Sequence, residues 1–167
     1  MGTALHSASA AGHLQIVRSL LRHGVGVDVR GHRNGTPLRL ASESGKSDVI
    51  QCLLDHGADV NSQDETHSTP LHWAAYGGSV DVVRVLLEHS ADVNSQDVDG
   101  RTPLRDAVDY FFLKRDYLQI ARLLLEHGAD VNTEDNRGRT PLQLALEKGH
   151  DELARLLSEF RSGRAQT

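Results

Sequence analysis

The chain repeats one short phrase at nearly constant intervals, and this periodicity restricts its fold more than any other feature. Every proline in the 167 residues follows a threonine and precedes a leucine, in phrases that begin at Thr36, Thr69, Thr102 and Thr140. A degenerate copy begins at Thr3, where alanine replaces the proline. Successive threonines are 33, 33, 33 and 38 residues apart, so the fourth unit carries five additional residues. Such a period indicates an array of stacked supersecondary units.

Each unit has the pattern of two helices joined by tight turns. Threonine is a good N-cap and proline suits the first helical position, so the phrase predicts the start of a first helix. The second helix is predicted by apolar pairs at helical spacing, such as 82–83 followed by 86–87 in the third unit. Glycines at 45 and 78 favour a reversal between the two helices, and Gly57 is placed as a C-cap. The segment after each second helix has the composition of a hairpin turn.

These residues resemble the ankyrin repeat, whose period is 33 residues and whose signature is Thr-Pro-Leu-His-x-Ala. The third unit matches best, with Thr-Pro-Leu-His-Trp-Ala at 69–74, whereas the fourth has Arg105 and Asp106 after its leucine. The resemblance implies an all-α solenoid of five stacked helix-turn-helix units with hairpin-like turns. We expect a single domain over 1–160 with a polar tail at 161–167; the units span about 1–30, 31–63, 64–96, 97–134 and 135–160.

Composition excludes several classes of protein. The formal net charge is −5, which argues against a protein that coats nucleic acid. A single cysteine excludes an internal disulfide framework. No apolar run approaches the roughly 20 residues of a membrane-spanning helix, and no signal peptide is recognisable. We therefore expect an intracellular monomer that does not insert into membranes, in the cytoplasm or the nucleus.

Candidate chemical groups are better explained by structure than by catalysis. Four of the ten histidines recur at one phase near the end of the second helix, where the helix dipole favours a cation. Cys52 lies in an apolar phase and is predicted to be a small core residue. No phosphate-binding glycine loop and no convergent carboxylates are recognisable. The sequence therefore predicts a protein that is not an enzyme and needs neither cofactor nor metal.

The family resemblance implies that a partner protein binds the hairpin tips and the exposed end of the first helices. When the family's tip positions are carried over to this sequence, the residues at these positions vary between units, whereas the framework residues stay constant. Such variation is expected of a recognition surface, and equally of unconstrained solvent positions. The tip candidates are His32, Arg33, Glu65, Thr66, Val98, Asp99, Arg101, Asn136, Arg137 and Arg139.

Aromatic residues point to one junction in the array. The chain has seven, and six of them fall on the third and fourth units. Protein-binding hot spots favour tryptophan, tyrosine and arginine. Packing is the alternative interpretation for the tryptophan and for the two phenylalanines. The candidates are Trp73, Tyr76, Tyr110, Phe111 and Phe112, with Lys114 and Arg115 as a charged rim.

One modification is also suggested by the resemblance. Asn61, Asn94 and Asn132 each follow a leucine by eight residues, and they resemble the ankyrin asparagine that asparaginyl hydroxylases modify. The favoured interpretation is that these asparagines shape the hairpins.

The sequence thus predicts non-catalytic protein–protein recognition on the concave surface, centred on the third and fourth units. Residues 64–134 hold six basic and thirteen acidic side chains, which would steer a basic partner toward them. Two alternatives stay open. One is a scaffold or an engineered repeat protein with no natural ligand. The other concerns the extent of the chain, which is either an intact small regulator or a targeting fragment of a larger receptor, channel or ligase. The abrupt start at Gly2 favours a fragment, whereas the polar last repeat favours an intact C-terminus.

Overall fold

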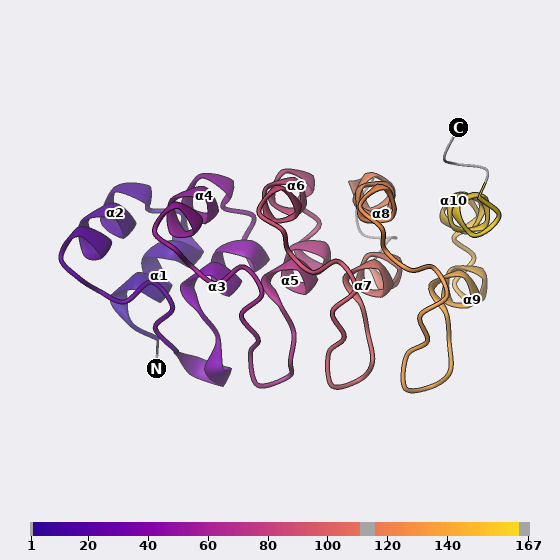
Figure 1. Ribbon diagram of the computed structural model, residues 1–167, viewed down its shortest axis with the longest axis horizontal. Coiled ribbons are helices and arrows are strands. Elements are labelled where there is room, and N and C mark those ends of the chain that lie inside the picture. Colours follow the sequence, from indigo (N-terminus) through magenta and orange to yellow (C-terminus); the bar gives the residue numbers. More distant parts are fainter. Residues whose placement is uncertain (1, 111–115, 164–167) are drawn as a thin grey trace.

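The computed structural model describes residues 2–110 and 116–163, and over these residues it is all-helical, as predicted. Figure 1 shows the helices in two parallel rows, with long loops projecting beyond the row of first helices. The first helices are α1 (Ala4–Ala11), α3 (Pro37–Glu43), α5 (Pro70–Gly77), α7 (Pro103–Asp109) and α9 (Pro141–Glu147). The second helices are α2 (Leu14–Arg22), α4 (Ser47–Asp55), α6 (Val80–Glu88), α8 (Asp116–Glu126) and α10 (Asp151–Arg161), and a short 3-10 helix, η1 (His32–Asn34), lies in one loop.

The repeated phrase starts each first helix by the expected capping chemistry. The Thr36 hydroxyl accepts a hydrogen bond from the backbone N–H of Arg39 at 3.2 Å. Where the phrase contains histidine, the ring links two units. The backbone N–H of Thr69 donates to His72 Nδ1 at 3.1 Å, and His72 Nε2 donates to the carbonyl of Arg101 in the next hairpin at 3.0 Å. The histidine therefore fixes the first helix and the following hairpin to each other.

The core runs continuously through both rows. First helices pack on neighbouring first helices, and second helices on neighbouring second helices. The repeated apolar pairs of the second helices face this core, and in α6 Val82, Val83 and Leu86 are fully buried. Each repeat contributes one slice of core that its neighbours cover, which is how a solenoid buries apolar surface.

Residues with a positive φ angle occur at the turns that the sequence predicts. Gly78 ends α5 with φ of 69° and permits the reversal into α6. Gly57 and Gly128 have φ of 82° and 88° after α4 and α8. Ser90 occupies the equivalent place after α6 and adopts φ of 64°, a region that costs a non-glycine residue free energy.

Gly77 allows α5 to approach α3 closely. A Cβ atom at this residue would lie 2.7 Å from the backbone oxygen of Glu43. One repeat later the equivalent position is Tyr110, so the end of α7 carries a large ring at the position where α5 has Gly77. This exchange gives the α5–α7 junction an aromatic lining.

The two ends of the array differ. At α2 Val17 alone is buried, and Ile16 is 50% exposed. At the other end α10 buries several leucines and exposes the polar side chains of Asp151 and Ser158. No helix among the described residues is long and apolar enough to cross a membrane.

Candidate partner-binding surface

Three of the four loops between repeats are hairpins that are each organised by one aspartate, whereas the first loop has Gly31 at the equivalent position. The carboxylate of Asp97 accepts hydrogen bonds from the backbone N–H groups of Asp99 and Arg101, at 2.9 and 2.8 Å. Asp64 and Asp135 make the same two bonds in their own hairpins. A polar side chain that satisfies two backbone donors stabilises a turn that would otherwise be mobile.

Neighbouring hairpins are also bonded to each other. The backbone N–H of Val98 donates to the carbonyl of Thr66 at 3.0 Å, and that of Asn136 donates to the carbonyl of Asp99 at 2.9 Å. At the start of the series, Glu65 donates to the carbonyl of Arg33 at 3.0 Å. The predicted tip residues therefore lie along one continuous edge.

Three aromatic side chains, which we call the aromatic cluster, meet at the α5–α7 junction: Trp73, Tyr76 and Tyr110. The ring centroids of Trp73 and Tyr76 are 5.7 Å apart, and those of Tyr76 and Tyr110 are 4.6 Å apart. Both pairs meet edge to face, a favourable geometry for aromatic rings. Tyr76 is 41% exposed, while the other two rings are half-buried.

The Trp73 side chain is packed against the protein on one side and exposed to solvent on the other. Its indole N–H donates to the carboxylate of Asp64 at 3.0 Å. The Arg39 guanidinium lies 3.9 Å from the centre of its ring and also contacts Asp64 at 3.4 Å. Both the packing and the binding interpretations of Trp73 therefore have a basis, because the side chain is anchored on one side and half-exposed on the other.

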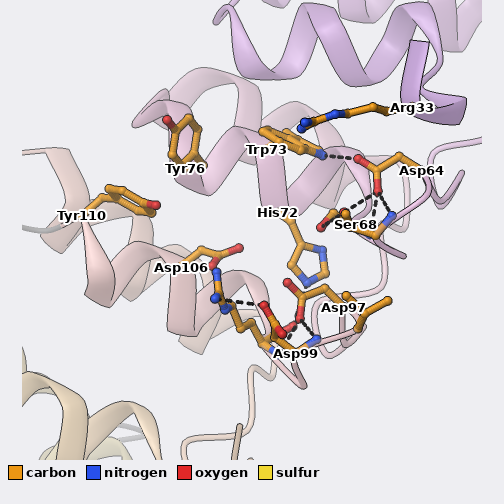
Figure 2. Close-up of a pocket in the computed structure, with 13 residues that line it drawn as sticks. Arg33, Asp64, Ser68, His72, Trp73, Tyr76, Asp97, Asp99, Asp106 and Tyr110 are labelled. Atoms are coloured by element: carbon orange, nitrogen blue, oxygen red, sulfur yellow. Dashed lines mark hydrogen bonds and ion pairs between the residues drawn. The ribbon is translucent and has the colours of Figure 1, made fainter. Parts of the chain in front are cut away.

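The aromatic cluster and the hairpin edge enclose a concave pocket of about 270 Å³ (Figure 2). Five of the predicted tip residues reach it: Arg33, Thr66, Val98, Asp99 and Arg101. The remaining lining residues are Asp64, Ser68, His72, Trp73, Tyr76, Asp97, Asp106 and Tyr110. The pocket thus unites the two surfaces that the sequence proposed separately.

Other predicted residues lie outside this pocket. His32 lines a separate hollow beside α1, and Glu65 forms an exposed ion pair with Arg33 at 3.2 Å. Asn136, Arg137 and Arg139 line a polar hollow over α7 and α9. Phe111, Phe112, Lys114 and Arg115 lie outside the described residues.

The pocket contains a buried carboxylate, Asp106, on α7. The residue is 9% exposed. Burial and, to a lesser extent, the nearby charge of Asp97 raise the pKa of Asp106 to about 7, although the positive charges of Arg105 and Arg101 oppose the change. The adjacent His72 has a lowered pKa, because burial disfavours its charged form. The ring is therefore neutral near pH 7, in keeping with its bonds to two repeats.

A second group of charges lies beneath the polar hollow over α7 and α9. The Arg105 guanidinium pairs with Asp109 on its own helix and with Asp135 at 3.3 Å. Arg139 contacts Asp135 at 2.9 Å, and Lys148 contacts Asp109 at 3.0 Å. Because these charges are mutually paired, the group joins the fourth and fifth repeats rather than offering a free charge.

The three candidate asparagines differ in their bonds. The side-chain oxygen of Asn61 accepts from the N–H of Asp92 in the next repeat at 2.8 Å, and that of Asn94 accepts from the N–H of Asp130 at 2.9 Å. Asn132 bonds only to Asp130, in its own turn, among the described residues. The first two bonds favour the structural interpretation, and hydroxylation at these sites stays a prediction.

Cys52 is buried on α4, and its sulfur lies 4.0 Å from Nδ1 of His56. That nitrogen also lies 2.8 Å from the carbonyl of Cys52. A carbonyl accepts and does not donate, so Nδ1 carries its proton toward it and is not placed to take one from the thiol. His23, His89 and His127 make the same bond to a carbonyl four residues earlier. The described residues contain no group of three side chains able to hold a metal ion.

Sequence reasoning predicted Asp99 but missed the pocket's other three acidic residues: Asp64, Asp97 and Asp106. Asp64 and Asp97 were detectable, because they recur 33 residues apart at the same position of their hairpins. Asp106 was visible as a break in the signature, because it stands where the third unit has Trp73. The sequence alone did not reveal that this exchange places a carboxylate below the aromatic rings.

A family model for ankyrin repeats matches the chain in three copies, at 1–64, 62–135 and 110–164. The chain belongs to the ankyrin-repeat family. Ankyrin repeats are generally modules for protein–protein interaction, and the family is typically non-enzymatic. No curated protein matches the chain.

Proposed function

We propose that this ankyrin-repeat protein is a non-catalytic recognition module that binds a partner protein in the pocket between the aromatic cluster and the hairpin edge. The observation that carries the proposal is the convergence of Trp73, Tyr76 and Tyr110 on one concave pocket with five variable tip residues. Aromatic anchors beside a polar rim are typical of binding hot spots.

Two features support a preformed surface. The hairpins are bonded internally and to each other, so binding would order few additional side chains. Tyr76 keeps 41% of its surface exposed although it contacts two other rings. An exposed ring that is already held by two neighbouring rings gains contact area on binding at little cost in conformational entropy.

We further propose that 1–160 acts as one monomeric domain of five units. The basis is the continuity of both helix rows from α1 to α10. Size-exclusion chromatography with light scattering tests the monomer directly, and a dimer mass would contradict it.

The experiment is an affinity capture from cell lysate with quantitative mass spectrometry. The bait is the wild-type chain, and the test variant carries Tyr76→Ala and Tyr110→Ala. The matched control carries Ile16→Ala and Leu146→Ala, which also removes two large apolar side chains but outside the pocket; Ile16 and Leu146 are 50% and 61% exposed. A melting curve for each protein establishes that the fold is retained.

The proposal expects a protein that wild type and control capture and that the tyrosine variant loses by at least tenfold. If the folded tyrosine variant retains every partner of wild type, recognition does not occur at the aromatic cluster.

A further inference from the structure

Asp106 stands apart from the other carboxylates of the pocket. The residue is 9% exposed, yet its side chain forms no hydrogen bond or ion pair with any described residue. Figure 2 shows it between Tyr110 and His72, pointing into the space that the rings and the hairpin edge enclose. A buried and unpaired carboxylate is costly, so its position calls for a partner.

The other acidic groups of the pocket already have hydrogen-bond or ion-pair partners. Asp64 accepts from the indole of Trp73 and contacts Arg39 at 3.4 Å. Asp97 accepts two backbone N–H groups of its own hairpin. Asp99 pairs with Arg101 at 2.9 Å. One carboxylate therefore remains for a ligand.

The positive charges nearest to Asp106 are engaged elsewhere. Arg105, on the same helix, pairs with Asp109 and Asp135. Arg101, in the preceding hairpin, pairs with Asp99. The ligand that completes the pocket therefore carries its own positive charge.

The walls of the pocket also suit a cation. Tyr76 and Tyr110 present aromatic surface beside the carboxylate, and aromatic faces attract cations through their quadrupole. The same protein already uses this contact, since the Arg39 guanidinium lies over Trp73 at 3.9 Å.

Resting on the function proposed above, we propose that the pocket receives an arginine side chain of the partner protein, with Asp106 as counter-ion and Tyr76 and Tyr110 as walls. A guanidinium is favoured over an ammonium because it is more weakly hydrated, stacks on aromatic rings and pairs with a carboxylate through two parallel hydrogen bonds. A metal ion lacks ligands here, because the described residues contain no suitable cluster.

The proposal also predicts how binding depends on pH. The groups that face Asp106 are Asp97 and Arg101 from the hairpin, Arg105 from α7 and His72 from α5. Since the pKa of Asp106 is raised to about 7, and that of His72 is lowered, Asp106 is the group that gains its charge near neutrality. Affinity for a cation therefore rises between pH 6 and pH 8.

The test is a fluorescence titration, because Trp73 is the sole tryptophan and lines the pocket. The probes are N-acetyl-arginine amide, its lysine counterpart, and the citrulline counterpart, which keeps the shape of arginine without the charge. For a ligand of this size we expect a Kd on the order of 1 mM for the arginine probe. The lysine probe binds more weakly, and the citrulline probe at least tenfold more weakly.

The decisive variant is Asp106→Asn, which preserves shape and removes the charge. This substitution should raise the Kd of the arginine probe at least tenfold and abolish the rise in affinity with pH. The matched control is Asp81→Asn, which removes one exposed carboxylate of α6 outside the pocket and should leave affinity unchanged.

The arginine pocket is wrong if the arginine and citrulline probes bind with equal affinity, or if Asp106→Asn leaves the Kd of the arginine probe unchanged. The choice of arginine over lysine is wrong if the arginine and lysine probes bind with equal affinity. The two proposals fail separately. If Asp106→Asn captures the same partner as wild type while the tyrosine variant loses it, the arginine pocket is wrong and the recognition surface stands. If the arginine probe binds as described but no partner depends on the tyrosines, the surface proposal is wrong.

Discussion

The hydroxyl of Tyr117 donates a 2.6 Å hydrogen bond to the backbone carbonyl of Tyr76. Tyr117 lies in the first turn of α8 and is 2% exposed. Its ring approaches Gly78 so closely that a Cβ atom there would lie 3.0 Å from it. The end of α5 that presents the exposed Tyr76 is therefore held by α8, the second helix of the next repeat.

We expect Tyr117→Phe to lower the free energy of unfolding by about 1–2 kcal/mol, because the hydrogen bond between the buried Tyr117 and the carbonyl of Tyr76 is lost while the packing is kept. Urea denaturation measures the change. An unchanged midpoint would mean that the bond does not hold the α5 end. Tyr110→Phe is the control, since it also removes one hydroxyl of the junction and should have a smaller effect.

Ser90→Gly should stabilise the protein by about 0.5–1 kcal/mol, since Ser90 adopts φ of 64° without the freedom of glycine. The equivalent Gly57 supplies the reciprocal test: Gly57→Ser at φ of 82° should be destabilising, although no atom crowds its Cβ position. Thermal unfolding followed by circular dichroism compares the two. A loss of stability in Ser90→Gly would contradict this interpretation of the turn.

Asp106→Asn should stabilise the folded protein at neutral pH, by about 1–3 kcal/mol. The pKa of Asp106 is raised in the folded state to about 7 from 3.8, so the folded chain holds a proton that the unfolded chain releases. Stability from this group is therefore complete below pH 4 and is lost as pH rises through about 7. Urea unfolding of wild type and variant at pH 5 and pH 8 measures it, and the gain from the variant should be larger at pH 8. A gain that is equal at both pH values would exclude a raised pKa.

Asp135→Asn should cost about 2–4 kcal/mol at pH 7, because it leaves the buried Arg105 without one of its counter-charges. Burial alone would raise the pKa of Asp135, but hydrogen bonds from Arg139 and Arg137 outweigh it and lower the pKa to about 2. The stabilisation is thus present above pH 4 and is lost as pH falls toward 2. Chemical denaturation at pH 7 and pH 3 tests this, and a cost that grows on acidification would contradict it.

The sequence predicts most of the fold because ankyrin repeats are specified locally. Each threonine cap, each turn glycine and each apolar pair recurs at a fixed offset, so its role is visible without knowledge of distant contacts. The sequence also predicts that Trp73, Tyr76 and Tyr110 lie near one another, and the ring distances confirm this.

The side-chain orientations that the sequence does not predict depend on contacts in the folded array. Tyr117 belongs to the aromatic group by position, yet it is buried beneath α5 rather than presented on the surface. Asp106 is recognisable as a departure from the signature, but its burial and its place in one pocket with the aromatic rings are visible only in the folded structure. Arg139 is predicted at a hairpin tip, whereas its guanidinium turns inward to Asp135. Such orientations depend on contacts that form only in the folded stack.

The most direct test of the recognition surface is site-specific photo-crosslinking in cell lysate, with Tyr76→p-benzoylphenylalanine as the probe and Ile16→p-benzoylphenylalanine as the exposed control. The account predicts that one partner protein is trapped covalently from position 76 and not from position 16, and that competing wild-type chain suppresses the crosslink. A partner trapped from position 16 and absent at position 76 would contradict it.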